Sequence, residues 1–274
     1  MVSKKSATEP SYFGPRSVVW RVHSNPITLL GGLRALLIQA LHPLAMAGVV
    51  DHSDMASDVF GRFRRTSDYL VVAIFGDRAA ADAMGARVRA IHRHVHGVDR
   101  ETGWPYRADD PELLLWVHCV LVDSFLAAQQ RYGTPLSGAE CNRYVAEMVS
   151  LAELVGLHRD EVPAGRAALR GCLASYRPVL RLTPGAKAAW NLLEHPPMRL
   201  VGRPIWALVF AAALDLMPKG MLAIYKKRGP IVPGSVLSAL AIAGTRMARL
   251  TGEPPPVLAE ALERAAREGV DLYP

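Results

Sequence analysis

Cysteine is scarce in this sequence. Cys119, Cys141 and Cys172 stand far apart, and none belongs to a CxxC pair. An odd number of widely spaced cysteines indicates neither a disulfide framework nor a thiolate metal site. We therefore expect the protein to work in a reducing compartment.

Long apolar runs and targeting segments are also missing. The longest apolar run, residues 205–214, has ten residues, about half of the roughly 20 that a membrane-spanning helix needs. The first residues include lysines, but no apolar stretch follows them, so no signal peptide is indicated. These absences predict a cytoplasmic protein. Peripheral contact with a membrane is compatible with this prediction.

No Ser/Gly linker and no internal repeat divides the 274 residues. A chain of this length can bury a full core. Residues 1–15 are polar, contain two prolines and show no period, so they predict a flexible N-terminal arm. We expect residues 16–274 to form one domain.

Apolar residues make up 50% of the chain, and alanine and leucine dominate among them. Few stretches have the pattern of a strand, so the composition predicts an all-α fold, a single-domain, multi-helix, globin-like bundle that encloses a cofactor pocket. Helices are expected at 27–50, with a kink at Pro43, and at 59–75, 79–97 and 109–133. The helices expected between residues 137 and 194 are interpreted as scaffold.

The net charge of +7 admits nucleic acid or an anionic membrane as a partner. The arginines, however, are scattered over helices and are not interleaved with aromatic residues, which argues against nucleic acid.

The densest chemical signal is residues 86–97, ARVRAIHRHVHG, where three histidines and three arginines share one predicted helix. Helical spacing places His92, His96 and Arg89 on one face and His94 roughly opposite. His92 is thus the inward candidate. An imidazole there could ligate haem iron, belong to a dinuclear or zinc site, act as a general base, or be a polar core residue.

Two further helices carry candidates. In 59–75, Arg62 and Thr66 lie one turn apart, and Arg62 stands among large apolar residues without a local acid, so it needs an anion. In 109–133, His118 has leucine, valine and phenylalanine as its helical neighbours and should be buried. Two buried histidines on successive helices can enclose a cofactor.

Four segments together carry a family resemblance: LLIQALHPLAMAGVVDHSD, GRFRRTSDYLVVAIFGD, RVRAIHRHVHG and YRADDPELLLWVHCVLVDS. In this order and spacing the chain resembles the DUF2236 family, which includes bacterial latex-clearing proteins (rubber oxygenases) and fungal mpaB-type oxygenases. The resemblance is strongest over residues 12–135. It implies an all-helical fold, haem b as cofactor, and an oxygenase that acts on an apolar organic substrate with dioxygen or peroxide.

The resemblance also implies roles for individual residues. His92 would be the proximal iron ligand in an Arg-x-x-His motif that begins at Arg89, and Arg62 and Thr66 would lie on the facing, distal side. His118 matches a further family histidine.

Independently of the family, a haem would need an apolar slot, cations for its propionates and room for its ring edge. Arg62 or Arg89 can supply the charge, and Gly85 the room.

This chain departs from the latex-clearing proteins at two places. Arg65 stands where they have a lysine that can ligate iron, and a guanidinium has no lone pair to donate. The stretch 27–50 contains no acid, whereas those enzymes carry a glutamate there that is proposed as a base. The sequence therefore does not support cleavage of polyisoprene.

Three interpretations of function stay open at this point. The first is a haem-dependent oxygenase in which His92 binds iron. The second is a nonhaem metal site built from His92, His96 and His118, although a carboxylate to complete it is missing from that face. The third is a noncatalytic helical protein that binds an apolar ligand or a membrane surface.

Overall fold

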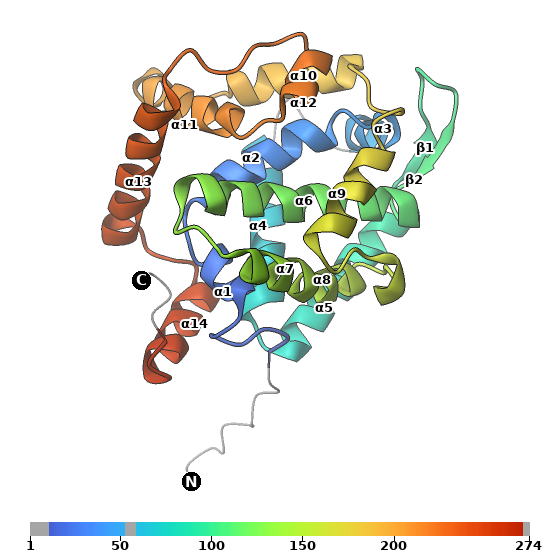
Figure 1. The fold of residues 1–274 in the computed structure, drawn as a ribbon. Helices are drawn as coiled ribbons and strands as arrows, with labels where there is room; N and C mark the ends of the chain where they lie inside the picture. Colours follow the sequence, from blue (N-terminus) through green and yellow to red (C-terminus); the bar gives the residue numbers. More distant parts are fainter. Residues whose placement is uncertain (1–10, 53–58, 271–274) are drawn as a thin grey trace.

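A computed structural model describes residues 11–52 and 59–270, and the side chains of 11–52, 64–248 and 252–270. Within these ranges the chain forms α-helices, two short 3-10 helices and one two-stranded sheet, which confirms the predicted all-α class (Figure 1). The elements are α1 (Val18–His23), α2 (Thr28–Gln39), α3 (Pro43–His52), α4 (Val59–Phe75), α5 (Arg78–Arg93), β1 (His96–Val98), β2 (Pro105–Arg107), α6 (Pro111–Tyr132), α7 (Gly138–Glu147), α8 (Val149–Leu154), η1 (Arg159–Glu161), α9 (Arg166–Ser175), α10 (Pro184–Glu194), η2 (Leu200–Gly202), α11 (Arg203–Asp215), α12 (Lys219–Ile224), α13 (Gly234–Thr251) and α14 (Pro256–Arg267).

Helix α6 is central, and α2 and α9 pack against it (Figure 1). It begins where the sequence predicts, because the Asp110 carboxylate accepts a hydrogen bond from the Glu112 amide at 2.8 Å and Pro111 occupies the first turn. By length and composition α6 could cross a membrane, but 61% of its most apolar window is buried inside the protein. This burial is typical of a core helix.

The predicted helix 27–50 is two helices. Between α2 and α3 the chain bends by 103°, far more than the kink expected at Pro43. His42 lies at the bend and is buried, and its Nδ1 accepts a hydrogen bond from the Ala45 amide at 3.4 Å. His42 thus caps α3. Burial lowers the pKa of His42 to about 4, so the ring is neutral and can accept this bond.

A buried arginine joins α2 to α6 and α11. Arg34 is 4% exposed, and its guanidinium donates to Asp123 Oδ2 at 2.7 Å, to Ser124 Oγ at 2.6 Å and to the Leu216 carbonyl at 2.9 Å. A buried charge is tolerated only when it is paired and hydrogen-bonded in this way.

Helix α5 is shorter than predicted. It ends at Arg93 with His94 at the C-cap, and His96 begins β1, which pairs antiparallel with β2 in the register His96 to Arg107. His96 is therefore not on the helix, and the prediction that it shares a helical face with His92 is wrong. The hairpin is fastened to α3, because Tyr106 Oη donates to Asp51 Oδ2 at 2.7 Å.

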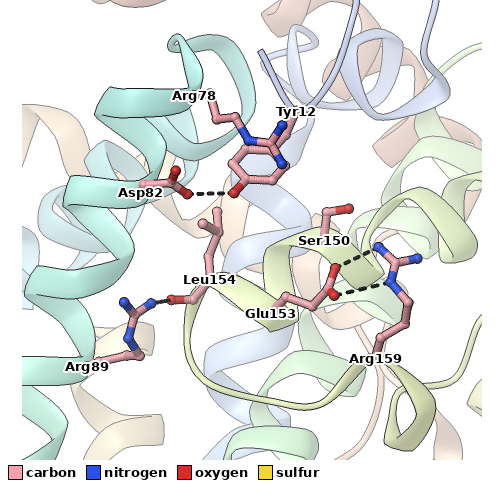
Figure 2. Close-up of a pocket in the computed structure, with 8 residues that line it drawn as sticks. All are labelled: Tyr12, Arg78, Asp82, Arg89, Ser150, Glu153, Leu154 and Arg159. Atoms are coloured by element: carbon pink, nitrogen blue, oxygen red, sulfur yellow. Dashed lines mark hydrogen bonds and ion pairs between the residues drawn. The ribbon is translucent and has the colours of Figure 1, made fainter. Parts of the chain in front are cut away.

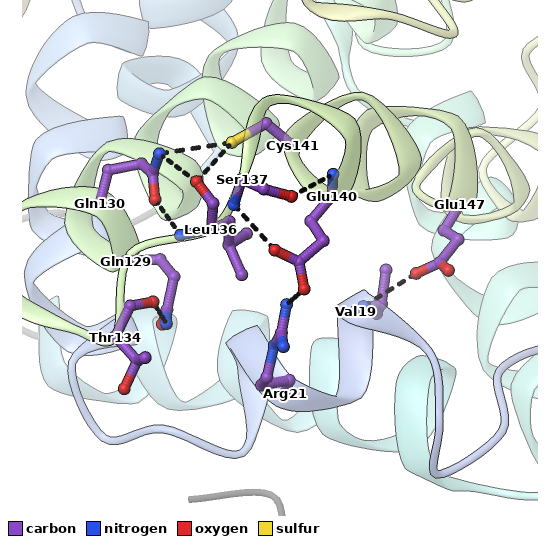
Figure 3. A network of polar contacts seen from close by, with 10 residues as sticks. All are labelled: Val19, Arg21, Gln129, Gln130, Thr134, Leu136, Ser137, Glu140, Cys141 and Glu147. Atoms are coloured by element: carbon purple, nitrogen blue, oxygen red, sulfur yellow. Dashed lines mark hydrogen bonds and ion pairs between the residues drawn. The ribbon is translucent and has the colours of Figure 1, made fainter. Parts of the chain in front are cut away.

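Contacts between α1 and α7 close the other side of the bundle (Figure 3). Ser137 and Glu140 form a capping box at the start of α7, and the Glu140 carboxylate also pairs with Arg21 of α1. The Val19 amide donates to Glu147 at 2.9 Å. Phe13, which precedes α1, is buried in the same core. The predicted arm falls largely in residues 1–10, outside the described residues.

The cysteines are free, as the absence of paired spacings predicts. Cys119 of α6 and Cys172 of α9 lie with their sulfur atoms 3.5 Å apart in a thiol hydrogen bond.

Candidate functional site

His92 lies in the last turn of α5 and is half-buried. Its Nδ1 is fully buried and has no hydrogen-bond partner among the described residues. An orphaned buried polar atom costs about 1–3 kcal/mol and is uncommon in native proteins, so it needs an explanation. A ligand bound at Nε2 would still leave Nδ1 without a partner, so this atom does not by itself indicate a ligand.

The electrostatic setting keeps this imidazole neutral. Burial lowers the pKa of His92, and the opposing effect of the Asp109 carboxylate is the smaller one. Asp109 is itself engaged, because Arg107 binds both of its oxygens at 3.0 Å. A neutral imidazole has one nitrogen lone pair free for a metal. Since Nδ1 is enclosed by protein, Nε2 is the nitrogen of His92 that could reach an iron.

Arg89, one turn before His92, binds α8. Its Nη1 donates to the carbonyl oxygen of Leu154, the last residue of that helix. Carbonyls in the last turn of a helix lack intrahelical partners, and a cation there also complements the helix dipole. Gly85 lies against the same carbonyl, because a Cβ at Gly85 would be 2.6 Å from Leu154 O. The space at Gly85, predicted to receive a ring edge, is therefore occupied by α8.

Arg89 also lines a surface cavity of about 360 Å³. Figure 2 shows its walls, which come from α5, α8, η1 and the segment before α1. Most of their charged groups are satisfied internally. Arg159 forms a two-point ion pair with Glu153, and the Tyr12 hydroxyl donates to Asp82 at 2.6 Å. From the sequence we interpreted the segment of α8 as scaffold. No local signal links it to the Arg-x-x-His motif at Arg89, which lies 65 residues before Leu154.

The candidates on α4 are less completely described. Arg62 lies within the helix, but its side chain is outside the described residues. The side chains of Arg65 and Thr66 are exposed. Helices α4 and α5 are packed neighbours joined at residues 76–77. The distal placement of Arg62 and Thr66 stays a prediction.

His118 is 5% exposed in α6, as predicted. Burial lowers the pKa of His118 to about 4, so its ring is neutral. Within the described part of the chain, no hydrogen bond and no ring contact joins it to His92. Nor does any group of three or more His, Cys, Asp or Glu side chains lie close enough to hold a metal ion among the residues searched. The nonhaem site of His92, His96 and His118 thus finds no support in these residues.

Fold and site together define a helical bundle with a half-buried histidine, His92, at the end of an arginine-rich helix. The chain belongs to the family described as ER-bound oxygenase mpaB/B′/rubber oxygenase, catalytic domain, whose profile matches residues 20–268. No curated protein and no solved structure matches it. The family confirms the resemblance stated from the sequence, and the chain is an enzyme of the oxygenase type.

The residues present fit a haem in one essential respect. Burial lowers the pKa of His92, so the lone pair of its neutral imidazole would be available to hold the iron of a haem. The cations for the propionates are less defined, because Arg89 is bound to α8 and the Arg62 side chain lies outside the described residues.

Proposed function

We propose that this protein is a haem b-dependent oxygenase that acts on an apolar organic substrate and uses dioxygen or peroxide. The observation that carries the proposal is the half-buried imidazole of His92 at the end of α5, whose pKa is lowered by burial, in a chain of the oxygenase family. When bound, haem would supply the redox chemistry, and the protein would supply binding, orientation and electrostatics.

His92 would hold the iron through Nε2. Burial keeps the ring neutral near pH 7, so no proton competes for the lone pair. The bond from Arg89 to Leu154 fastens the last turns of α5 to α8 and so limits the movement of His92. In this proposal Arg89 is a positioning residue as well as a candidate for cofactor binding.

Arg62 and Thr66 would act on the distal side. Arg62 would balance a propionate or an oxygen species, and Thr66 would donate or accept a hydrogen bond one turn away. Arg65 cannot ligate iron, because a guanidinium stays protonated. We therefore expect the ferric protein to bind azide or cyanide readily.

An apolar substrate suits the segment α2 and α3, which contains no acid between residues 27 and 50. The same absence removes the base expected for cleavage of polyisoprene, so we propose a different apolar substrate. The predicted cytoplasmic location is retained in this proposal.

The test is the visible spectrum of protein produced with haem supplied. We expect a Soret band that His92→Ala abolishes or strongly weakens while the helical circular dichroism is unchanged. His94→Ala is the matched control, because His94 is exposed at the adjacent C-cap. Imidazole added to His92→Ala should partly restore the band by replacing the missing ligand.

Two results would refute the proposal. Unchanged haem occupancy in His92→Ala would mean that another residue ligates the iron. His118 would then be the next residue to substitute. Wild-type protein without a Soret band would exclude haem, and metal analysis would then separate a nonhaem enzyme from a noncatalytic binding protein.

A further inference from the structure

Apolar side chains are exposed over η2, α11 and α13, at one end of the molecule (Figure 1). On η2 and α11 they recur at i, i+4 and i+7, at Val201 (82% exposed), Ile205 (68%) and Leu208. On α13 they recur with the same spacing at Val236, Leu240 and Ala243. Each helix therefore carries an apolar stripe that faces solvent, in addition to its packed stripe.

The two stripes lie on neighbouring helices. Helices α11 and α13 pack together, with Leu237 and Ala212 in one buried cluster that Val209 flanks. A Cβ on Gly234 would lie 3.4 Å from Asp215 Oδ1, so α13 begins near the end of α11.

Leu208 precedes the packed Val209, and Val236 precedes the buried Leu237. We call the exposed stripes of these two packed helices together the α11/α13 face. Ile231, in the loop that leads to α13, is fully exposed at 102%. Exposed apolar patches of this kind are uncommon on monomeric proteins and mark interaction sites.

The same segment holds most of the excess positive charge of the chain. Residues 199–246 contain seven Lys and Arg and one acid, Asp215, whereas the whole chain has a net charge of +7. Asp215 is already paired with Arg131 at 2.9 Å. Six of the basic side chains are exposed and form no ion pair with the side chains that the structure describes: Arg199, Arg203, Lys219, Lys226, Arg228 and Arg246. Lys227 is also exposed but contacts Glu194 at 3.5 Å.

We propose that the α11/α13 face docks on an anionic phospholipid bilayer. Exposed apolar stripes on helices that also carry exposed arginines, Arg203 on α11 and Arg246 on α13, have the composition of interfacial helices, whose apolar side chains enter the acyl boundary while the cations meet lipid headgroups. Anionic lipids are concentrated on the cytoplasmic leaflet, which matches the location that the sequence predicts. An apolar substrate would also partition into such a membrane.

A second copy of the chain fits this face less well. Symmetric pairing would bring two strongly basic segments together with one acid each, which is repulsive. A nucleic acid would satisfy the cations but leave the apolar stripes of α11 and α13 in water. Only a surface that is both anionic and apolar beneath its headgroups satisfies both features.

The test is flotation of the full chain with lipid vesicles. We expect binding to vesicles of phosphatidylcholine with about one third phosphatidylglycerol, and binding weaker by roughly tenfold to phosphatidylcholine alone or in high salt. The double variant Ile205→Glu/Leu240→Glu removes the centre of both stripes and should lower the affinity by a further tenfold, roughly. Both side chains are exposed, so the fold should be retained.

The matched control is Val98→Glu, which also replaces an exposed apolar side chain with glutamate. Val98 lies in β1, away from the α11/α13 face, and is 57% exposed. It should bind anionic vesicles like the wild type. Failure of wild-type binding, or equal binding by the double variant, would overturn the proposal. A dimer in size-exclusion chromatography that the double variant dissociates would assign the face to a second copy. The haem spectrum is measured separately, so the oxygenase proposal stands or falls independently.

Discussion

Replacing Gly85 with alanine tests whether α5 is held against α8 through direct backbone contact. Gly85 is buried inside α5, where alanine would ordinarily stabilise the helix by about 1 kcal/mol. Here the new Cβ would lie 2.6 Å from the carbonyl oxygen of Leu154 and 3.2 Å from its Cβ. A backbone carbonyl cannot rotate away as a side chain can, so α5 and α8 must separate.

The separation has two costs. Forcing an extra methyl group into a filled contact costs about 1–3 kcal/mol. The same shift lengthens the hydrogen bond from Arg89 to Leu154, and a bond to a charged group contributes about 1.5–3 kcal/mol when intact. Only part of that bond would be lost, and the helix propensity of alanine offsets about 1 kcal/mol. We expect Gly85→Ala to lower the free energy of unfolding by about 1–3 kcal/mol.

Urea unfolding followed by far-ultraviolet circular dichroism measures the effect. Gly171→Ala is the matched control, because Gly171 is inside α9 and a Cβ there meets nothing within 4 Å. It should stabilise the protein by up to about 1 kcal/mol. If Gly85→Ala were as stable as the wild type while Gly171→Ala behaved as expected, the contact of α5 with Leu154 would not be as close as described. In that case the positioning role of Arg89 would also lose its basis.

Two further perturbations test the buried polar groups. Arg34→Ala should destabilise the fold by about 3 kcal/mol or more, because Asp123 loses its buried partner, whereas the exposed Arg131→Ala should cost less than about 1 kcal/mol; equal losses in urea unfolding would contradict the burial of Arg34. The pKa values of His42 and His118 are lowered to about 4, so between pH 6.5 and 4 the unfolded chain binds protons that the folded chain does not. The free energy of unfolding should therefore fall as the pH falls below 6.5, by up to about 1.4 kcal/mol per pH unit for each histidine. Above pH 6.5 these two histidines should not change it. His118→Phe should flatten the dependence of the urea midpoint on pH, and an unchanged slope would argue against a neutral, buried His118.

Helix positions were predictable where the signal is local. Asp110 and Pro111 start α6 because an N-cap and a first-turn proline act within one turn of the chain. Pro43 marks the break after α2 for the same reason, since a proline removes a hydrogen bond wherever it lies. The angle of that break, 103°, is set by the helices packed around it and is not encoded at Pro43. The end of α5 was missed because the β1–β2 pairing takes residues that are compatible with a helix.

The sequence by itself determined the class of fold, the family and the chemical inventory of the site. Helical periodicity and the Arg-x-x-His motif depend only on the spacing of residues along the chain, and the family profile reads the same order of residues. The sequence also places the excess of positive charge in residues 199–246.

Only the tertiary structure decided which of these side chains are enclosed and by what. Leu154 follows Arg89 by 65 residues, yet it fills the space at Gly85 and binds the guanidinium. Burial in the folded chain lowers the pKa of His92 and leaves its Nδ1 without a partner among the described residues. Burial, and the pKa that follows from it, belongs to the neighbours that folding brings together, and helical spacing carries no information about them.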